Sequence, residues 1–171
     1  MKKILTVLFS AVVLLSAGCR YEAPLTEEHV VPVDPKLLGL WEEMRDGDDD
    51  EKPNRMLVLK FSDTEYLIHY PMTGDEIMYW RAYPVKVGGV SCVQIQLLSS
   101  DDGRPAEGVT RLYQVMGYKI EDGVLGTVPM EEKLVDDDLG TSAEIKEAFL
   151  KNKDNKNLFP ESDASFFKKV R

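Results

Sequence analysis

Two tight turns divide the middle of the chain into long strands, and they constrain its fold more than any other feature. Gly88-Gly89 and Asp122-Gly123 are two-residue sequences that suit the positive backbone φ of a β-hairpin turn. Between them, Val93, Ile95 and Leu97 alternate with polar residues, which predicts a strand with one apolar face. Long strands joined by such turns, without alternating helices, indicate an antiparallel meander and not a parallel α/β sheet.

The same pattern predicts eight strands and one late helix. The expected strands cover residues 38–43, 56–61, 66–70, 77–87, 90–98, 109–120, 124–128 and 166–170. Pro84 indicates a bulge or a sheet edge within the fourth. Thr141-Ser142-Ala143-Glu144 fits a capping box at the start of a helix. We therefore expect a mainly β domain, an eight-stranded up-and-down barrel or half-barrel with one C-terminal α-helix before the last strand.

The segment Asp34-Pro35-Lys36-Leu37-Leu38-Gly39-Leu40-Trp41 resembles the first signature of the lipocalins and related calycins, a helical turn followed by Gly-x-Trp. The resemblance implies that Gly39 allows close backbone approach and that Trp41 plugs the closed end of the barrel. It also implies a basic residue stacked on the tryptophan, a role for which Arg171 and Lys169 are the candidates. The second signature of the family, around a Thr-Asp-Tyr turn, is absent, and simple core packing of Trp41 is the alternative.

The N-terminus carries a separate signal. Lys2 and Lys3 precede an apolar run that ends at Leu15 and is shorter than the ~20 residues of a membrane-spanning helix. Small residues then lead to Cys19, and this stretch resembles the lipobox of bacterial lipoproteins. The resemblance implies cleavage before Cys19, with a diacylglyceryl group and an N-linked acyl chain such as palmitate on that residue. An ordinary secretory signal is the alternative.

These signals predict three parts: a signal peptide over residues 1–18, a lipidated cysteine and extended tether over 19–36, and a single barrel-like domain over 37–171. The pair Val30-Val31 in the tether is also a candidate for a short edge strand. Arg20 follows the cysteine where an aspartate favours inner-membrane retention in enteric lipoproteins. The resemblance therefore implies anchoring in the outer membrane, with the domain facing the periplasm.

Charge and cysteine content narrow the possible partners. The net charge is −9, and such a surface repels nucleic acid, so we expect no nucleic-acid partner. The chain has two cysteines, and lipidation of Cys19 leaves Cys92 without a partner for a disulfide. Because Cys92 lies in an apolar strand pattern, we expect a buried and inert thiol.

No residue pattern singles out a catalytic or metal centre. The two histidines, His29 and His69, belong to no zinc-binding motif, and no glycine-rich phosphate loop is present. The acidic run at residues 46–51 lacks both the glycine and the final glutamate of a calcium loop, and the run at 136–138, which has Glu147 at the twelfth place, lacks the glycine at the sixth. We therefore expect no catalysis, no cofactor beyond the covalent lipid, and no metal.

Aromatic residues supply the candidate binding site. Tyr66, Tyr79, Trp80 and Tyr83, together with Tyr70, are expected to line a cavity for an amphipathic ligand, although they also suit an ordinary core or rim. Two functions follow. One is a membrane-anchored, non-catalytic, lipocalin-like module that binds a small apolar or amphipathic ligand. The other is an envelope-maintenance or protein-interaction lipoprotein, a scaffold or inhibitor, whose barrel is solid.

Overall fold

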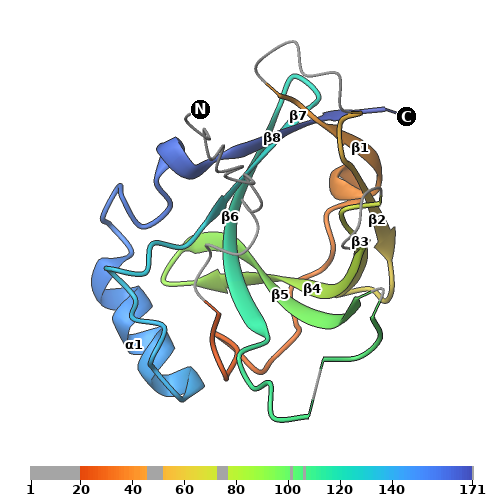
Figure 1. Ribbon diagram of the computed structural model, residues 1–171. Helices are drawn as coiled ribbons and strands as arrows, with labels where there is room; N and C mark the ends of the chain where they lie inside the picture. Colours follow the sequence, from red (N-terminus) through yellow and green to blue (C-terminus); the bar gives the residue numbers. More distant parts are fainter. Residues whose placement is uncertain (1–19, 46–51, 73–76, 101, 106, 171) are drawn as a thin grey trace, which may run out of the picture.

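Eight antiparallel strands close into a barrel in the computed structural model, which describes residues 20–45, 52–72, 77–100, 102–105 and 107–170 (Figure 1). Each strand pairs with its neighbours in sequence, and β8 returns to β1, with Trp41 opposite Lys169. The strands are β1 (Gly39–Glu43), β2 (Arg55–Lys60), β3 (Tyr66–His69), β4 (Met78–Val87), β5 (Val90–Ser100), β6 (Tyr113–Glu121), β7 (Val124–Pro129) and β8 (Ser165–Lys169). The predicted fold class is confirmed, and the barrel is closed.

Both predicted hairpin turns are present. Gly88 and Gly89 have φ angles of 57° and 89°, and Asp122 and Gly123 have φ angles of 50° and 79°. These positive values match the right-handed twist of the flanking strands. The turns therefore set the register of the two longest hairpins.

Two strand details differ from the expectation. Residues 109–112 form no strand, and β6 begins at Tyr113, because the chain leaves a turn at Gly108 with Val109 exposed to solvent. In β4, the irregular register lies between Tyr79 and Trp80 and not at Pro84. Since β3 begins with Tyr66 opposite Ala82, Pro84 lies beyond β3 in the part of β4 that pairs only with β5. A missing amide is tolerated at such an edge.

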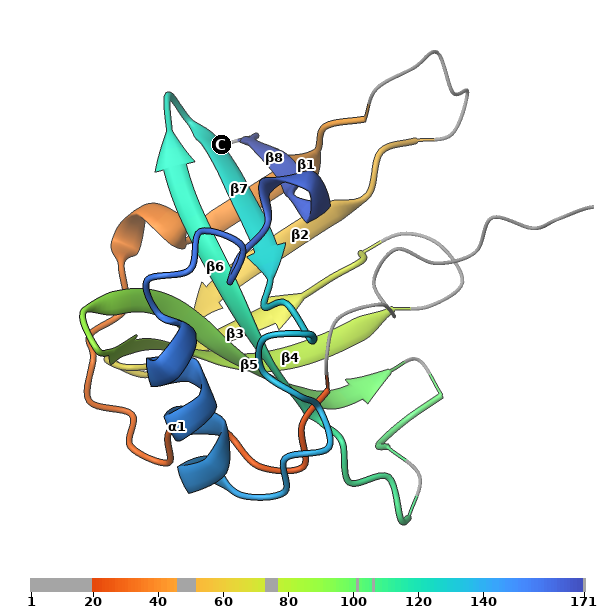
Figure 2. The same cartoon turned by 90° about the vertical axis from the view of Figure 1, so that its left-hand side faces the viewer.

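The helix α1 (Ser142–Asn152) lies outside the barrel, before β8 (Figure 2). The predicted capping box is present, because Thr141 accepts a hydrogen bond from the backbone of Glu144, whose side chain accepts one from the backbone of Thr141. Ile145 and Phe149 are fully buried on the face toward the barrel. No helix in the described ranges is long and apolar enough to cross a membrane.

Residues 20–34, which the sequence assigned to an extended tether, instead pack along the outside of the barrel. Tyr21 is fully buried and exchanges two backbone hydrogen bonds with Tyr113, of 2.8 and 3.1 Å. Leu25 is also buried, whereas Val30 is 69% exposed and no strand forms at Val30-Val31. The segment packs on the barrel because Tyr21 and Leu25 bury their apolar side chains there. The prediction of an extended tether rested on the prolines and did not take these two side chains into account.

The barrel wall therefore separates two apolar cores. The inner core fills part of the barrel and includes Trp41, Tyr66, Ala82 and Phe167. The outer core lies between the wall, α1 and the N-terminal segment; its buried members are Tyr21, Leu25, Tyr83, Val85, Val87, Cys92, Val115, Met130, Val135, Ile145, Phe149 and Leu158.

Candidate functional site: the barrel cavity

A cavity of about 350 Å³ lies inside the barrel. Its wall is mainly apolar, with Val58, Ile68, Ile95, Met116 and Leu125 contributed by five different strands. Each of these side chains points inward because alternate residues of a strand face opposite sides of the sheet. The volume falls at the lower end of the range typical of small-molecule sites.

One end of the barrel is covered by a short helix and the tryptophan beneath it. The 3-10 helix η1 (Pro35–Leu37) precedes β1, and Trp41 is fully buried and donates a hydrogen bond from Nε1 to the Leu37 carbonyl at 2.9 Å. Lys169 Nζ lies 5.0 Å from the centroid of the Trp41 ring and donates to the Lys36 carbonyl at 2.9 Å. Gly39 has a φ of 125°, a conformation that favours glycine. The basic residue over Trp41 is thus Lys169, whereas Arg171 lies outside the described residues.

The opposite end opens to solvent. There the cavity is bordered by Tyr70, Trp80 and Pro129, and by Ser162 and Asp163, which are exposed. We call this the mouth end, and the end covered by η1 the closed end. The meander places the C-terminal ends of β1, β3, β5 and β7, and the N-terminal ends of β2, β4, β6 and β8, at the mouth end. The tight turns after β4 and β6 lie at the closed end.

The predicted aromatic residues divide between the two faces of the wall. Tyr66 and Trp80 line the cavity, as does Tyr70. Tyr79 is 37% exposed on the outside, where it stacks on His69 with ring centroids 4.5 Å apart. Tyr83 is buried in the outer core, and its hydroxyl donates to the Thr26 carbonyl at 2.8 Å. Because successive residues of β4 face opposite sides of the wall, alternation distinguishes Trp80, which faces the cavity, from Tyr79 and Tyr83, which face outward.

The residues predicted from the sequence to line the cavity did not include any from β6. Gln114, Met116 and Tyr118 all line the cavity from this strand. Their spacing of two residues places them on one face, so strand periodicity was the signal that would have found them. Gly117 lies between them, and a Cβ there would stand 2.8 Å from the Phe159 ring on the other face of the wall.

Tyrosine hydroxyls are among the polar groups of the cavity, whose lining also includes Gln114, Thr127, Ser162, Asp163 and Ser165. Burial raises the pKa of Tyr66 to about 12, and it also raises the pKa values of Tyr70 and Tyr118. These hydroxyls therefore remain protonated at neutral pH. The Tyr66 hydroxyl accepts a hydrogen bond from the backbone amide of Asp34 at 2.5 Å, and the Tyr70 hydroxyl donates to Glu43 at 3.4 Å. The cavity thus combines apolar walls with a few neutral hydrogen-bonding groups inside and the carboxyl group of Asp163 at its mouth.

The other candidate groups are engaged elsewhere. Arg111 forms ion pairs with Asp137 and Asp138, and the Asp138 backbone amide donates to Asp136, so the acidic cluster is partly neutralised. Cys92 is fully buried, as expected, and burial raises the pKa of its thiol to about 12. The acidic run at 46–51 and the lipidation candidate Cys19 lie outside the described residues.

A second hollow lies on the surface between α1, the N-terminal segment and the end of β4. Its lining includes Glu27, Glu28, Lys86 and Lys146, charges of both signs. Such a groove offers less enclosure for an apolar ligand than the barrel interior does. The barrel cavity is therefore the candidate functional site.

Comparisons with family models, curated proteins and solved structures find no match for the chain. The cavity and the N-terminal sequence signal are therefore the features that point to a function.

Proposed function

We propose that this protein is a membrane-anchored, non-catalytic, lipocalin-like module that binds a small apolar or amphipathic ligand inside its barrel. The cavity of about 350 Å³ is the observation that carries the proposal. The lipobox-like sequence before Cys19 supports a lipid anchor, and Arg20 supports the outer membrane as its location, with the domain facing the periplasm. An exported carrier of this kind needs no metal or cofactor in the barrel.

The distribution of polar groups favours an amphipathic ligand. Ser162 and Asp163 are exposed at the mouth, whereas Val58, Ile68 and Leu125 line the interior. An apolar chain placed inside would lose its contact with water, which contributes about 25 cal/mol for each Å² buried. A polar group on the same ligand would remain at the mouth, within reach of water and of hydroxyl groups.

A cavity-filling variant tests the proposal. Ile95 lines the cavity from β5, so Ile95→Trp fills part of the space and should sharply weaken binding of a fluorescent fatty acid. Leu98→Trp is the matched control, because Leu98 is exposed on the same strand and does not line the cavity. The control should bind like the parent protein. Equal affinity in all three proteins would overturn the assignment of the cavity as the binding site.

Native mass spectrometry of the protein from its own envelope provides an independent measurement. An extra mass that is lost on denaturation, and is absent in Ile95→Trp, identifies the natural ligand class. An unliganded mass together with failure to bind the fluorescent fatty acid would favour the alternative, a protein-interaction lipoprotein. Cross-linking in intact cells would then identify its partner.

A further inference from the structure

The N-terminal segment is fixed to the barrel from its first described residues. Tyr21 pairs with Tyr113, which begins β6 at the mouth end. The Tyr21 hydroxyl donates to the Val135 carbonyl at 2.7 Å, and the Leu25 amide donates to the fully buried Gln94 side chain at 2.6 Å. These contacts leave no slack in the chain after Tyr21.

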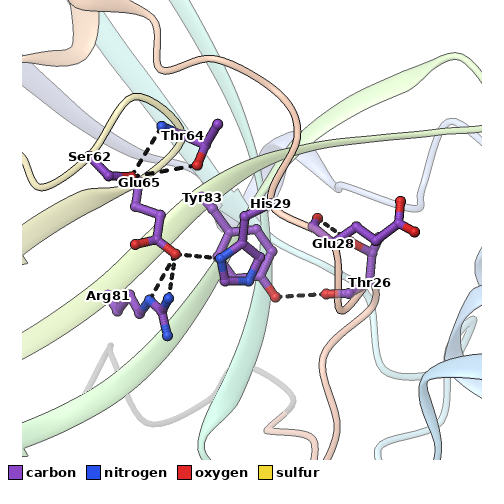
Figure 3. A network of polar contacts seen from close by, with 8 residues as sticks. All are labelled: Thr26, Glu28, His29, Ser62, Thr64, Glu65, Arg81 and Tyr83. Carbon is purple, nitrogen blue, oxygen red and sulfur yellow. Dashed lines mark hydrogen bonds and ion pairs between the residues drawn. The ribbon is translucent and has the colours of Figure 1, made fainter.

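Further contacts hold the segment as it runs toward the closed end. Figure 3 shows His29 stacked on Tyr83, with ring centroids 3.6 Å apart, and paired through Nδ1 with Glu65. Arg81 donates to the same Glu65 carboxylate through Nε at 3.1 Å. Beyond this cluster, the Val33 amide donates to the Asp63 carbonyl at 2.9 Å in the turn after β2. The segment therefore follows the whole length of the wall and begins at the mouth end.

The position of Tyr21 limits how far the barrel can stand from a lipid anchor. Tyr21 lies two positions after Cys19 in the sequence, and an extended chain spans at most about 7 Å over that interval. The nine residues of β6 extend over about 30 Å at the rise of an antiparallel strand. A lipid on Cys19 thus holds the mouth end near the bilayer, and the closed end lies roughly a strand length from this attachment point.

We infer that the barrel sits on the bilayer with its mouth toward the lipid, and that it exchanges a single-chain membrane amphiphile directly with that bilayer. This inference rests on the proposed lipid anchor and ligand cavity, and adds the docking surface and the source of the ligand. Exposed apolar side chains occur at both ends, for example Val109 near the mouth and Phe61 near the closed end, so they do not determine the orientation. The attachment point of the chain determines it.

Labels at the two ends of the barrel test the orientation. Val109→Cys places a fluorescent maleimide at the mouth end, and Ser91→Cys places one at the closed end; both positions are exposed, and Cys92 is buried. The acylated full-length protein is reconstituted in vesicles of phosphatidylethanolamine and phosphatidylglycerol that contain nitroxide-headgroup lipid. Several-fold stronger quenching at position 109 than at position 91 is expected. Equal quenching, the reverse order, or absence of acyl groups on Cys19 would overturn the inference.

A spacer variant tests whether the short attachment matters for ligand exchange. A flexible Gly-Ser insert between Arg20 and Tyr21 should abolish the difference in quenching and slow uptake of a fluorescent fatty acid from the vesicles, with the final amount bound unchanged. The same insert after Gly123, in the exposed turn between β6 and β7 at the closed end, is the control and should leave both properties as in the parent. Unchanged uptake rate in the first variant overturns direct exchange. No uptake by the parent, with the quenching difference intact, overturns the proposed ligand binding and leaves the orientation standing.

Discussion

The inner and outer cores use opposite faces of the same strands, yet they are packed differently. Along β4, Trp80 and Ala82 face the barrel interior, whereas Tyr83 and Val85 face α1 and the N-terminal segment. The inner core surrounds the cavity of about 350 Å³. The outer core includes Tyr21, Val135, Ile145 and Phe149, all with no exposed surface.

This difference indicates a division of roles across one sheet. A densely packed core resists changes in volume, because its side chains have no space into which to move. A core with an internal cavity forgoes some contacts and gains room for a ligand. We therefore expect mutations in the outer core to affect stability most, and mutations in the inner core to affect binding most.

The largest expected effect is truncation of Phe149 in the outer core. Phe149 is fully buried and packs edge-on against Phe159 with ring centroids 6.4 Å apart. Phe149→Ala should lower the free energy of unfolding by about 3–5 kcal/mol, as measured by chemical denaturation. Lys146→Ala, at an exposed position of the same helix, should change it little. A small loss for Phe149→Ala would show that the outer core is looser than its burial suggests.

Removal of the Gln94 amide should be the next largest effect. Its side chain accepts from the Leu25 amide and donates to the Gln114 carbonyl at 2.8 Å, with no exposed surface. Gln94→Leu leaves both backbone groups without this partner, at a cost of about 1–3 kcal/mol each. Hydrogen exchange at Leu25 should also accelerate. Gln96→Leu, a half-buried position on the same face of β5, is the comparison; equal effects would argue against a specific role for Gln94.

A matched pair of valines compares the two cores directly. Val115 belongs to the outer core, and Val93 lines the cavity. Val115→Leu should cost about 1–3 kcal/mol because the added volume has no space. Val93→Leu should leave stability nearly unchanged and reduce ligand affinity. Thermal melting and a fatty-acid titration measure the two effects, and an equal loss of stability would remove the distinction between the cores.

The smallest expected effect is a pH dependence at Glu65, where the N-terminal segment meets β4. Burial by itself raises the pKa of this carboxyl, but hydrogen bonds from Arg81 and His29 outweigh burial and hold its pKa below the ordinary value of 4.5. The stabilisation is therefore present above pH 4.5 and is lost as the pH falls through the lowered pKa. Urea unfolding midpoints should differ between the parent and Glu65→Gln at pH 6 and converge toward pH 3. A constant difference would contradict this account.

Local patterns were sufficient to predict the strands, both hairpin turns and the capped helix. Alternation, glycine at positive φ and the Thr141–Glu144 capping box each act over a few residues, so one sequence contains the whole signal. The closure of β8 onto β1 was expected only as one of two possibilities, because pairing between distant strands depends on the curvature of the entire sheet.

The candidate site was predicted less completely. Tyr66 and Trp80 were placed correctly at the cavity, but Tyr79 and Tyr83 were grouped with them by composition and not by alternation. The docking of residues 20–34 was missed because it depends on Tyr113 and Gln94, which are far away in the sequence. Such contacts form between segments that only the folded barrel wall and α1 bring together, so no local sequence pattern predicts them.

The pairing of β8 with β1 also has a consequence for how the chain folds. A chain that stops before Ser165 leaves β1 and β7 with unpaired edges, and exposed edges are sites for association with other chains. The contact between Trp41 and Lys169 joins residues that are 128 positions apart in the sequence. Contacts over such long sequence separations slow folding. The barrel therefore closes late in synthesis, and chains that have not yet closed it are the ones that most need protection from aggregation.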